Sequence, residues 1–508
     1  MNLDVFDQTN GFITQWTVAG DATARTITLP LVNTRVEGAL SYNCTVDWGD
    51  GSALSTVTAY NDANRIHTYA ANGTYNVEIR GTCEGWSFNN AGDKLKITQI
   101  IYWGDAGGFN GFKYLSGGFW GCANLTSLGT GVILPSGTGI LSDGFNQTFQ
   151  GCASLASIPM DLFRYNTAVT TDGFHGTFQD CTSLTSIPTD LFRYNTTVTV
   201  NAFNSTFWGC VSLTSIPTDL FRYNTAVTQN GFYYTFYNTA LTSIPTDLFR
   251  YNTTVTSQGF YGTFQGCASL ISIPTDLFRY NTTVSTNGFT ATFANCTSLT
   301  SVPADLFRYN TAVSGAGFSS TFQNCTSLAT VPADLFRYNT TCRDFSYVFY
   351  GCRNLQVLSN TFYEPGEETT RFLNKSMDFT NSFNRTSFTG TQGTAPDLWT
   401  CDFGETITLS TAPATDWAPG DTITGQTSGA TALVVSRVSA LVYKINQHFG
   451  TFTLGETVGV TGVPAKLAAQ DGSHPTFSGK PTSTHCFGGA GNSLASLVNY
   501  ASIPTSWE

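Results

Sequence analysis

The sequence predicts a mainly β protein with short helices, in which a solenoid of stacked repeats follows one β-domain and carries a second, smaller one. The first observation is a nonapeptide, IPTDLFRYN at Ile187–Asn195, that occurs seven times when one or two substitutions are allowed. The second is the composition, with 11% charged residues, 49 Gly and 39 Phe, which is typical of a β-rich and loop-rich chain. The third is that β-favouring sequence without the repeat lies on both sides of it.

The repeat has a nearly constant length. The Asp of the DLF triplet stands at positions 161, 190, 219, 247, 276, 305 and 334, so the interval is 29 residues with one exception of 28. Self-similarity at 20–29 residues is the signature of a leucine-rich solenoid, in which each unit buries its apolar face against its neighbours. We expect a leucine-rich-repeat solenoid over 109–403, right-handed and continuous, with a parallel sheet along one side at roughly 4.8 Å per coil.

One unit runs from Gly173 to Asn195. In GFHGTFQDC, Phe174, Phe178 and Cys181 recur at i, i+4 and i+7, which predicts one face of a short helix. The next piece, SLTSIP, is a short β-favouring run that stops at a proline, and predicts the strand of the sheet. The DLF triplet should then open a helical turn, and Asn195 suits a left-handed exit from it.

Stacking such units places identical side chains in rows. Each arginine of the Arg164–Arg337 row has an Asp three residues earlier, so the row can neutralise itself. Cysteines also form rows, and a translated row points every thiol the same way, which favours small buried thiols over disulfides. The row cysteines are Cys122, Cys152, Cys181, Cys210, Cys267, Cys296, Cys325 and Cys352.

Residues 1–108 carry a different pattern. TVDWGDGS at Thr45–Ser52, followed by IHTYAANGTYNVEIRG, resembles a PKD domain. This resemblance implies an immunoglobulin-like β-sandwich with a tight turn at Asp50 and packing by Tyr69 and Tyr75. Alternatively, Asp47 and Asp50 could contribute oxygen ligands to Ca²⁺.

The repeat itself also resembles a known family. TFQDCTSLTSIPTDLF is similar to the leucine-rich repeats of BspA-type bacterial surface proteins, and the likeness covers 109–403. It implies a solenoid used for adhesion or recognition, with no catalytic residues to carry over.

The repeat pattern lapses after position 403 and returns near the end. APDLW at Ala395–Trp399 and the stretch Cys486–Pro504 both echo the repeat, whereas 404–479 shows unrelated β alternation. We interpret 404–479 as a small β-domain inserted into the last coil, similar to the β-modules of phage virion proteins, and 480–508 as the terminal repeat. An open stack needs caps, so the PKD-like domain should cover the first coil and 486–507 should complete the last.

No catalytic or metal motif is present, and we predict no catalytic residue, no metal and no cofactor. None of the five histidines has metal-ligand spacing. A metal held by His474, His485, Cys486 and Cys401 is an alternative to their packing role. The acidic loop Glu364–Glu368 is interpreted as solvated, with a cation site as the alternative.

Candidate binding residues follow from the variation between copies. The positions between and just after the two Phe of GFxxTF vary while the scaffold does not, and their aromatic members fall on adjacent coils. Tyr and Trp suit glycan stacking or a protein contact. The predicted patch consists of Trp208, Tyr233, Tyr234, Tyr237 and Tyr261. The alternatives are neutral variation of exposed sites and a binding face made by the Thr and Ser hydroxyls of SLTSIP.

Charge and hydropathy limit the partners. The net charge of −11 without a basic run excludes a nucleic-acid groove, and no apolar stretch approaches the ~18 residues of a membrane span. The N-terminus has no secretory pattern, so we expect a protein that stays in a cytoplasm or leaves by a route without a signal.

These observations lead to a functional expectation. We expect a non-enzymatic virion-surface protein (fibre, spike or capsid decoration), homo-oligomeric and attached to other virion structural proteins, that recognises a host-surface glycan or protein. The alternatives are a BspA-type bacterial cell-surface adhesin, a purely architectural virion protein and a glycan hydrolase. The last would need two carboxylates at a set separation.

Overall fold

The computed structural model describes residues 10–35, 38–136 and 139–355. Beyond these it describes 361–363, 366–367, 371–373, 375–384, 398, 401, 405–449, 452–453, 455–464 and 467–469. The chain divides into two compact units, Met1–Val284 and Ser285–Glu508, and each is considered by itself. The described residues form mainly strands and turns, and Ala63–Arg65 form the 3-10 helix η1. None of them belongs to a helix long and apolar enough to cross a bilayer.

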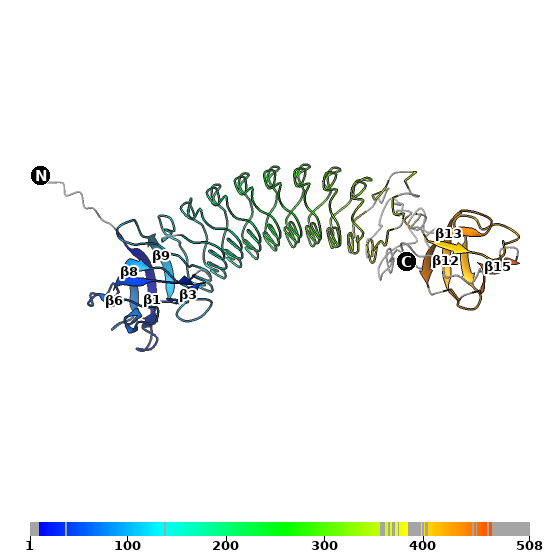
Figure 1. Cartoon of the computed structure of the whole chain (residues 1–508). Coiled ribbons are helices and arrows are strands. Elements are labelled where there is room, and N and C mark those ends of the chain that lie inside the picture. Colours follow the sequence, from blue (N-terminus) through cyan, green and yellow to red (C-terminus); the bar gives the residue numbers. More distant parts are fainter. Residues whose placement is uncertain are drawn as a thin grey trace. The chain divides into compact units, whose positions relative to one another are not determined.

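The first unit opens with an antiparallel β-domain. Its main sheet has the order β6-β5-β8-β1-β9, and two-stranded sheets β2-β7 and β3-β4 complete it (Figure 1). The strands are β1 (Phe12–Val18), β2 (Thr26–Thr28), β3 (Thr34–Arg35), β4 (Gly38–Ala39), β5 (Tyr42–Asp47), β6 (Ser55–Val57), β7 (Ile66–Thr68), β8 (Gly73–Cys83) and β9 (Ile97–Trp103). Alternate residues of β1 and β5 are buried, so one face of the sheet packs on the core.

The turn motif of this domain is held by its own carboxylates. Asp47 accepts the amide of Gly49, and Asp50 accepts that of Ser52 while its other oxygen lies 2.8 Å from Nε2 of His67. These hydrogen bonds form a tight turn, which was the first of the two interpretations of this motif. Tyr69 is fully buried, as expected, and its ring stacks on that of Tyr75 at 3.9 Å.

The β-domain covers the apolar face of the first coil. Main-chain bonds join Trp86 to Tyr114 (3.1 Å) and Ile100 of β9 to Ser127 (2.9 Å). One cluster of buried rings spans both parts, made of Phe12, Trp86, Trp103, Phe109, Phe112 and Phe119. The segment from Trp86 to β9 thus acts as a starting layer for the stack, which is the cap that an open repeat array needs.

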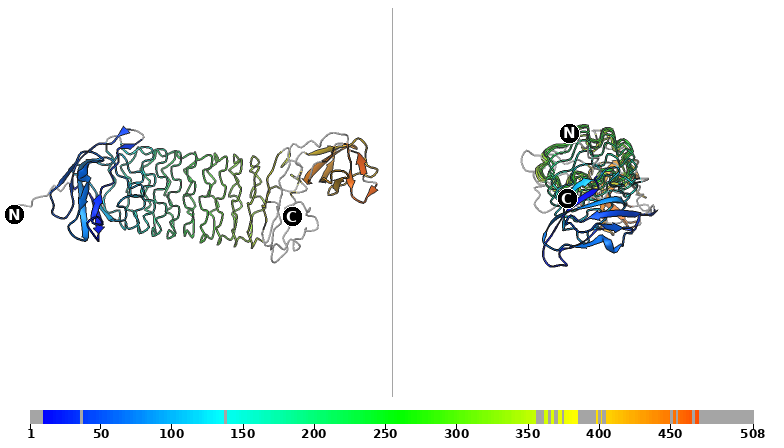
Figure 2. Two further views of the ribbon diagram at one scale, coloured as in Figure 1. Left: turned by 90° about the horizontal axis from the view of Figure 1, so that it is seen from below. Right: turned by 90° about the vertical axis from the view of Figure 1, so that its left-hand side faces the viewer.

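Each following coil contains a ribbon of overlapping turns, where we predicted a helix. In GFHGTFQDC the amide of His175 bonds back to Asp172, three residues earlier, while the next amide, Gly176, bonds forward to Asn204 on the next coil (2.8 Å). This alternation continues along the ribbon and joins neighbouring coils at every second amide. The coils of the first unit are stacked one after another (Figure 2). The predicted helix over 173–181 is therefore wrong.

The helix fails because every fourth residue of the ribbon has left-handed backbone. An α-helix needs right-handed dihedral angles throughout, and a single positive φ interrupts it. In the first unit these residues are Asp143, Gln147, Gly151, Asp172, Gly176, Asp180, Asn201, Ser205, Gly209, Asn230, Tyr234, Asn238, Gln258, Gly262 and Gly266. Most are Asn, Asp or Gly, the residues that adopt this conformation most easily.

The predicted parallel sheet is replaced by single hydrogen bonds and isolated bridges between coils. Around SLTSIP the coils share single bonds, such as the amide of Thr185 to the carbonyl of Ala156 (3.3 Å), and in the second unit isolated bridges such as Ser301 to Thr330. The described SLTSIP segments therefore do not build continuous strands.

Buried asparagines close the bends between coils. Nδ2 of Asn195 donates to the carbonyls of Phe163 (3.2 Å) and Asn166 (2.9 Å) on the preceding coil. The same pair of bonds is made by Asn224, Asn252, Asn281 and Asn339. Asn195 is not among the residues with positive φ, so the predicted left-handed exit is wrong; its side chain holds the bend.

In the second unit a buried arginine takes the place of the next asparagine. Nη2 of Arg371 donates to the carbonyls of Phe336 (3.1 Å) and Asn339 (3.3 Å). Burial lowers the pKa of this guanidinium to about 10. Nearby, Glu367 of the acidic loop lies 3.0 Å from Nη2 of Arg337.

The second unit also holds an antiparallel sheet of order β10-β13-β12-β11-β14-β15 (Figure 1). Its strands are β10 (Thr406–Thr408), β11 (Thr422–Gly425), β12 (Thr431–Arg437), β13 (Val442–Phe449), β14 (Thr457–Val460) and β15 (Leu467–Ala469). Ile407, Trp417 and Tyr443 lie in its core. The predicted terminal repeat 480–508, its contact with Ala395–Trp399 and the metal alternative at His474, His485 and Cys486 concern residues outside the described ranges.

Candidate functional site

The candidate site lies on the outer side of the turn ribbon. Within the ribbon the two Phe of GFxxTF point into the core, whereas the residues between and after them range from buried, as Ser205 is, to partly exposed, as Trp208 is. Because adjacent coils are joined amide to carbonyl along this ribbon, residues about one repeat apart become direct neighbours. The five predicted aromatic residues all belong to the first unit, on coils that follow one another.

The structure brings these five rings into one cluster. Ring centroids lie 4.3 Å apart for Trp208 and Tyr237, 4.9 Å for Trp208 and Tyr234, and 4.8 Å for Tyr233 and Tyr261. Tyr234 is at the centre, because its ring contacts those of the other four. We call these five residues the aromatic patch.

The patch is half-buried rather than fully exposed. All five side chains are of intermediate exposure, because the rings cover one another. Burial raises the pKa of Tyr234, and the neighbouring phenols of Tyr261 and Tyr233 raise it further. Tyr234 therefore stays neutral at physiological pH, and the patch offers ring faces, ring edges and hydroxyl groups to a ligand.

Tyr234 also has an unfavourable backbone conformation. Its φ is 51°, a region that large side chains rarely adopt and that costs about 1 kcal/mol or more. The equivalent residue of two other coils is glycine, Gly176 and Gly262. A Cβ added to Gly262 would overlap the ring of Tyr234, so the small residue leaves room for that ring. The chain thus places a strained tyrosine at the patch centre where glycine would fit.

The residues around the patch are mostly neutral. Gln179, Asn204 and Gln265 occupy equivalent positions on the same or adjacent coils. The titratable residues beside the patch are His175 and Asp180, whose amide bonds to the carbonyl of Trp208 (2.7 Å). Burial lowers the pKa of His175, while Asp172 and Asp143 oppose that shift. Polar and aromatic groups of this kind can bind a ligand, but no nucleophile with its base is placed here.

The hydroxyl face that was the alternative site is exposed, but some of its hydroxyls have partners. Oγ1 of Thr185 lies 3.3 Å from the carbonyl oxygen of Ala156, and that of Thr182 3.3 Å from Ala153. These bonds connect coils. They leave fewer free hydroxyls for a ligand than the sequence suggests.

Sequence reasoning missed an exposed row of stacked arginine and tyrosine. The guanidinium of Arg193 lies over the rings of Tyr194 (5.7 Å) and Tyr223 of the next coil (5.4 Å), and its neighbours repeat this arrangement. The predicted pairing with Asp three residues earlier is present, at 3.6 Å for Asp190. The Arg-Tyr pair in each FRYN motif was the sequence feature that could have revealed this row. Cation–π contacts between coils stabilise such a row.

The row cysteines are buried and unbridged in the described structure. Their thiols contact carbonyls of the preceding coil, as Cys181 does with Phe149 (3.2 Å). In the 28-residue repeat, which lacks the cysteine, the hydroxyl of Thr239 bonds to Phe236 instead (3.0 Å). The cysteine row therefore fills space in the core and forms hydrogen bonds to the backbone.

The thiols should be unreactive in the native protein. Burial raises the pKa of Cys267 to about 11 and that of Cys325 to about 12, so almost no thiolate, the reactive form, is present. We expect a maleimide to leave all eight row cysteines unlabelled in native protein and to label them after denaturation, as read by mass spectrometry. Rapid native labelling, or disulfide-linked peptides, would contradict this assignment.

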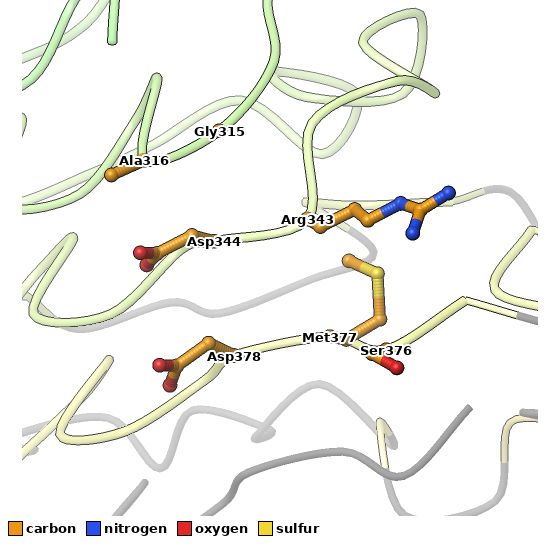
Figure 3. Close-up of a pocket in the computed structure, with 7 residues that line it drawn as sticks. All are labelled: Gly315, Ala316, Arg343, Asp344, Ser376, Met377 and Asp378. Atoms are coloured by element: carbon orange, nitrogen blue, oxygen red, sulfur yellow. The ribbon is translucent and has the colours of Figure 1, made fainter. Parts of the chain in front are cut away.

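A cavity of ≈370 Å³ in the second unit is lined by two carboxylates, which do not form a catalytic or metal-binding site (Figure 3). The side chains of Asp344 and Asp378 lie one above the other on neighbouring coils. Each caps its own turn, because Oδ1 of Asp344 accepts the amide of Ser346 (2.9 Å) and that of Asp378 the amide of Thr380 (2.8 Å). Within the described residues, no group of three or more His, Cys, Asp or Glu side chains could hold a metal.

Fold and surface together define a β-rich repeat solenoid with a half-buried aromatic patch. No protein-family model and no curated protein matches the chain. Among solved structures, it is similar to a leucine-rich repeat protein from Bacteroides ovatus, with 17% identity over 63% of this chain and 88% of the other, and a TM-score of 0.25. A TLR13–ssRNA13 complex matches at 12% identity over 53% and 55%, with a TM-score of 0.13. Such TM-scores do not define a fold, which here follows from the bonds between coils.

Proposed function

We propose that the chain is a non-enzymatic recognition protein of a phage particle, a leucine-rich-repeat solenoid preceded by a PKD-like, immunoglobulin-type domain. It is displayed on the virion surface as a fibre, spike or capsid decoration and binds a host-surface glycan or protein through the aromatic patch. Other virion structural proteins hold it, and homo-oligomers multiply weak contacts by avidity.

One observation carries the proposal: a tyrosine at the patch centre in strained backbone. The scaffold does not need Tyr234, because Gly176 and Gly262 fill the same position without strain. Strained residues persist where function requires them, and clustered Tyr and Trp are the side chains that dominate binding energy. The neutral surroundings favour a carbohydrate or a polar protein surface over a charged ligand.

The test replaces the patch with residues that this chain already uses at the equivalent positions. The variant combines Trp208→Gln, Tyr237→Gln, Tyr234→Gly, Tyr233→Asn and Tyr261→Ser. We expect it to lose binding to host cells by at least tenfold, whereas its melting temperature changes little because the scaffold tolerates each replacement in another coil.

A matched control removes tyrosines elsewhere. Tyr165, Tyr223 and Tyr251 are exposed on the arginine–tyrosine row, and their replacement by Ser should leave host binding unchanged. Equal binding by the patch variant and the wild type would refute the patch. It would leave a purely architectural role in the virion as the better account. Finding the protein anchored on bacterial cells, with no particle containing it, would favour the alternative of a BspA-type cell-surface adhesin.

A further inference from the structure

We propose a second binding site, for a neutral mono- or disaccharide, in a cavity where the β-domain of the first unit meets the first coils. The cavity measures ≈420 Å³, within the range of about 300–1,000 Å³ that small-ligand pockets occupy. It is lined by Asn33 before β3, Tyr60 after β6, Asn89 after β8, Tyr114 of the first coil and Gln147 of the second. The site is distinct from the aromatic patch and does not depend on it.

The polar groups in this cavity are available to a ligand. The side-chain amides of Asn33, Asn89 and Gln147 have no hydrogen-bond partner within the described protein, and neither do the hydroxyls of Tyr60 and Tyr114. Nδ2 of Asn195, by contrast, donates to two carbonyls of the preceding coil. Three amides and two phenols thus converge on one space with their hydrogen-bonding capacity unused.

Two residues at the cavity have a positive φ, as Tyr234 does at the centre of the aromatic patch. Gln147 has a φ of 55° and Asn89 a φ of 44°. The residues equivalent to Gln147 on the coils before and after it are glycines, Gly117 and Gly176, which adopt positive φ without cost. Other coils place Ser205 and Tyr234 at this position with similar φ, so the conformation belongs to the ribbon, and on this coil it carries a glutamine that lines the cavity.

The lining selects the chemical class of the ligand. None of the described residues that line the cavity is charged at neutral pH, so phosphate, carboxylate and ammonium groups would lose their hydration without an ion partner. Carboxamides both donate and accept hydrogen bonds, as sugar hydroxyls do, and tyrosine rings pack against the apolar face of a sugar. A neutral saccharide satisfies both groups of side chains.

The test uses the full chain on a glycan array that carries neutral and acidic oligosaccharides, followed by calorimetry with the best neutral probe. We expect neutral saccharides to be retained and acidic ones not. Gln147→Gly removes one amide and relieves the strained backbone, and Tyr60→Ala removes a ring that is 37% exposed; each should weaken binding about fivefold. Their controls, Gln229→Ala and Tyr165→Ala, replace exposed residues outside the cavity and the patch and should leave the affinity unchanged.

The outcomes separate this site from the patch. Loss of binding in Gln147→Gly with full binding in Tyr234→Gly supports the cavity. Retention of acidic probes alone, retention of none, or unchanged affinity in Gln147→Gly overturns it, and none of these results bears on host attachment by the aromatic patch. Loss in Tyr234→Gly alone assigns the saccharide to the patch and also overturns the cavity site.

Discussion

Replacement of Phe221 by Ala should destabilise the first unit by about 4 kcal/mol, the cost of a cavity left by a fully buried ring. Phe221 is inaccessible to solvent, and its ring lies 6.1 Å from each of the equivalent rings on the two adjacent coils, Phe192 and Phe249. It also packs on Phe203 (4.6 Å) and Phe232 (4.8 Å). One truncation therefore weakens the coupling on both sides of a coil.

The measurement is denaturation by urea, followed by circular dichroism. Because a repeat array unfolds according to the coupling between neighbours, the variant should lose cooperativity as well as stability, and its transition should broaden or split. Tyr223→Ala is the control, since this ring is 38% exposed and contributes mainly cation–π contacts, for a loss below about 1 kcal/mol. A similar small loss in both variants would contradict the stacked core.

Replacement of Asn224 by Ala should cost about 3 kcal/mol, because it removes the side-chain donor of two buried carbonyls, and only one of them keeps another donor, the amide of Asn195. These are the carbonyls of Phe192 (3.0 Å) and Asn195 (2.9 Å), and Asn224 itself is inaccessible to solvent. The expected loss exceeds that of an ordinary hydrogen bond, since water cannot replace the missing donor.

The control for this prediction also lies near two carbonyls of the preceding coil, but at the surface. Oγ1 of Thr254 is 2.9 Å from the carbonyl oxygen of Thr225 and 2.8 Å from that of Val227, and its single proton can bond to one of them at a time. The residue in the preceding coil is already alanine, Ala226. Thr254→Ala should therefore cost under about 1 kcal/mol in the same urea titration. If the two variants lost equal stability, the buried asparagines would not be the element that holds the bends.

The interior was predictable from the sequence, whereas the path of the chain was not. The spacing of Phe174, Phe178 and Cys181 correctly placed all three inside. The same spacing suggested a helix, because a period near four is shared by a helix and by a ribbon with one left-handed residue in every four. Asp172 and Asp180, which flank the two Phe, were the available sign that such residues recur.

The two candidate sites differ in how far sequence reasoning could reach. Members of the aromatic patch are one repeat apart, so the period alone made Tyr233 and Tyr261 neighbours. The cavity, in contrast, combines Asn33 and Tyr60 from loops of the β-domain with Gln147 from a coil. No periodicity relates those segments, and only their packing in three dimensions brings them together.

The starting layer formed by the segment from Trp86 to β9 has a consequence for how the chain is made. Each coil bonds to residues about one repeat away, for example 29 or 32 positions for Asn195, so contact order stays low however long the array becomes. The β-domain is synthesised first and provides a folded layer, so that each new coil can pack on the structure before it as the chain leaves the ribosome. We therefore expect the first unit to assemble from its N-terminal end, so that a copy of the repeat can be gained or lost in evolution without altering the step by which the next one is added.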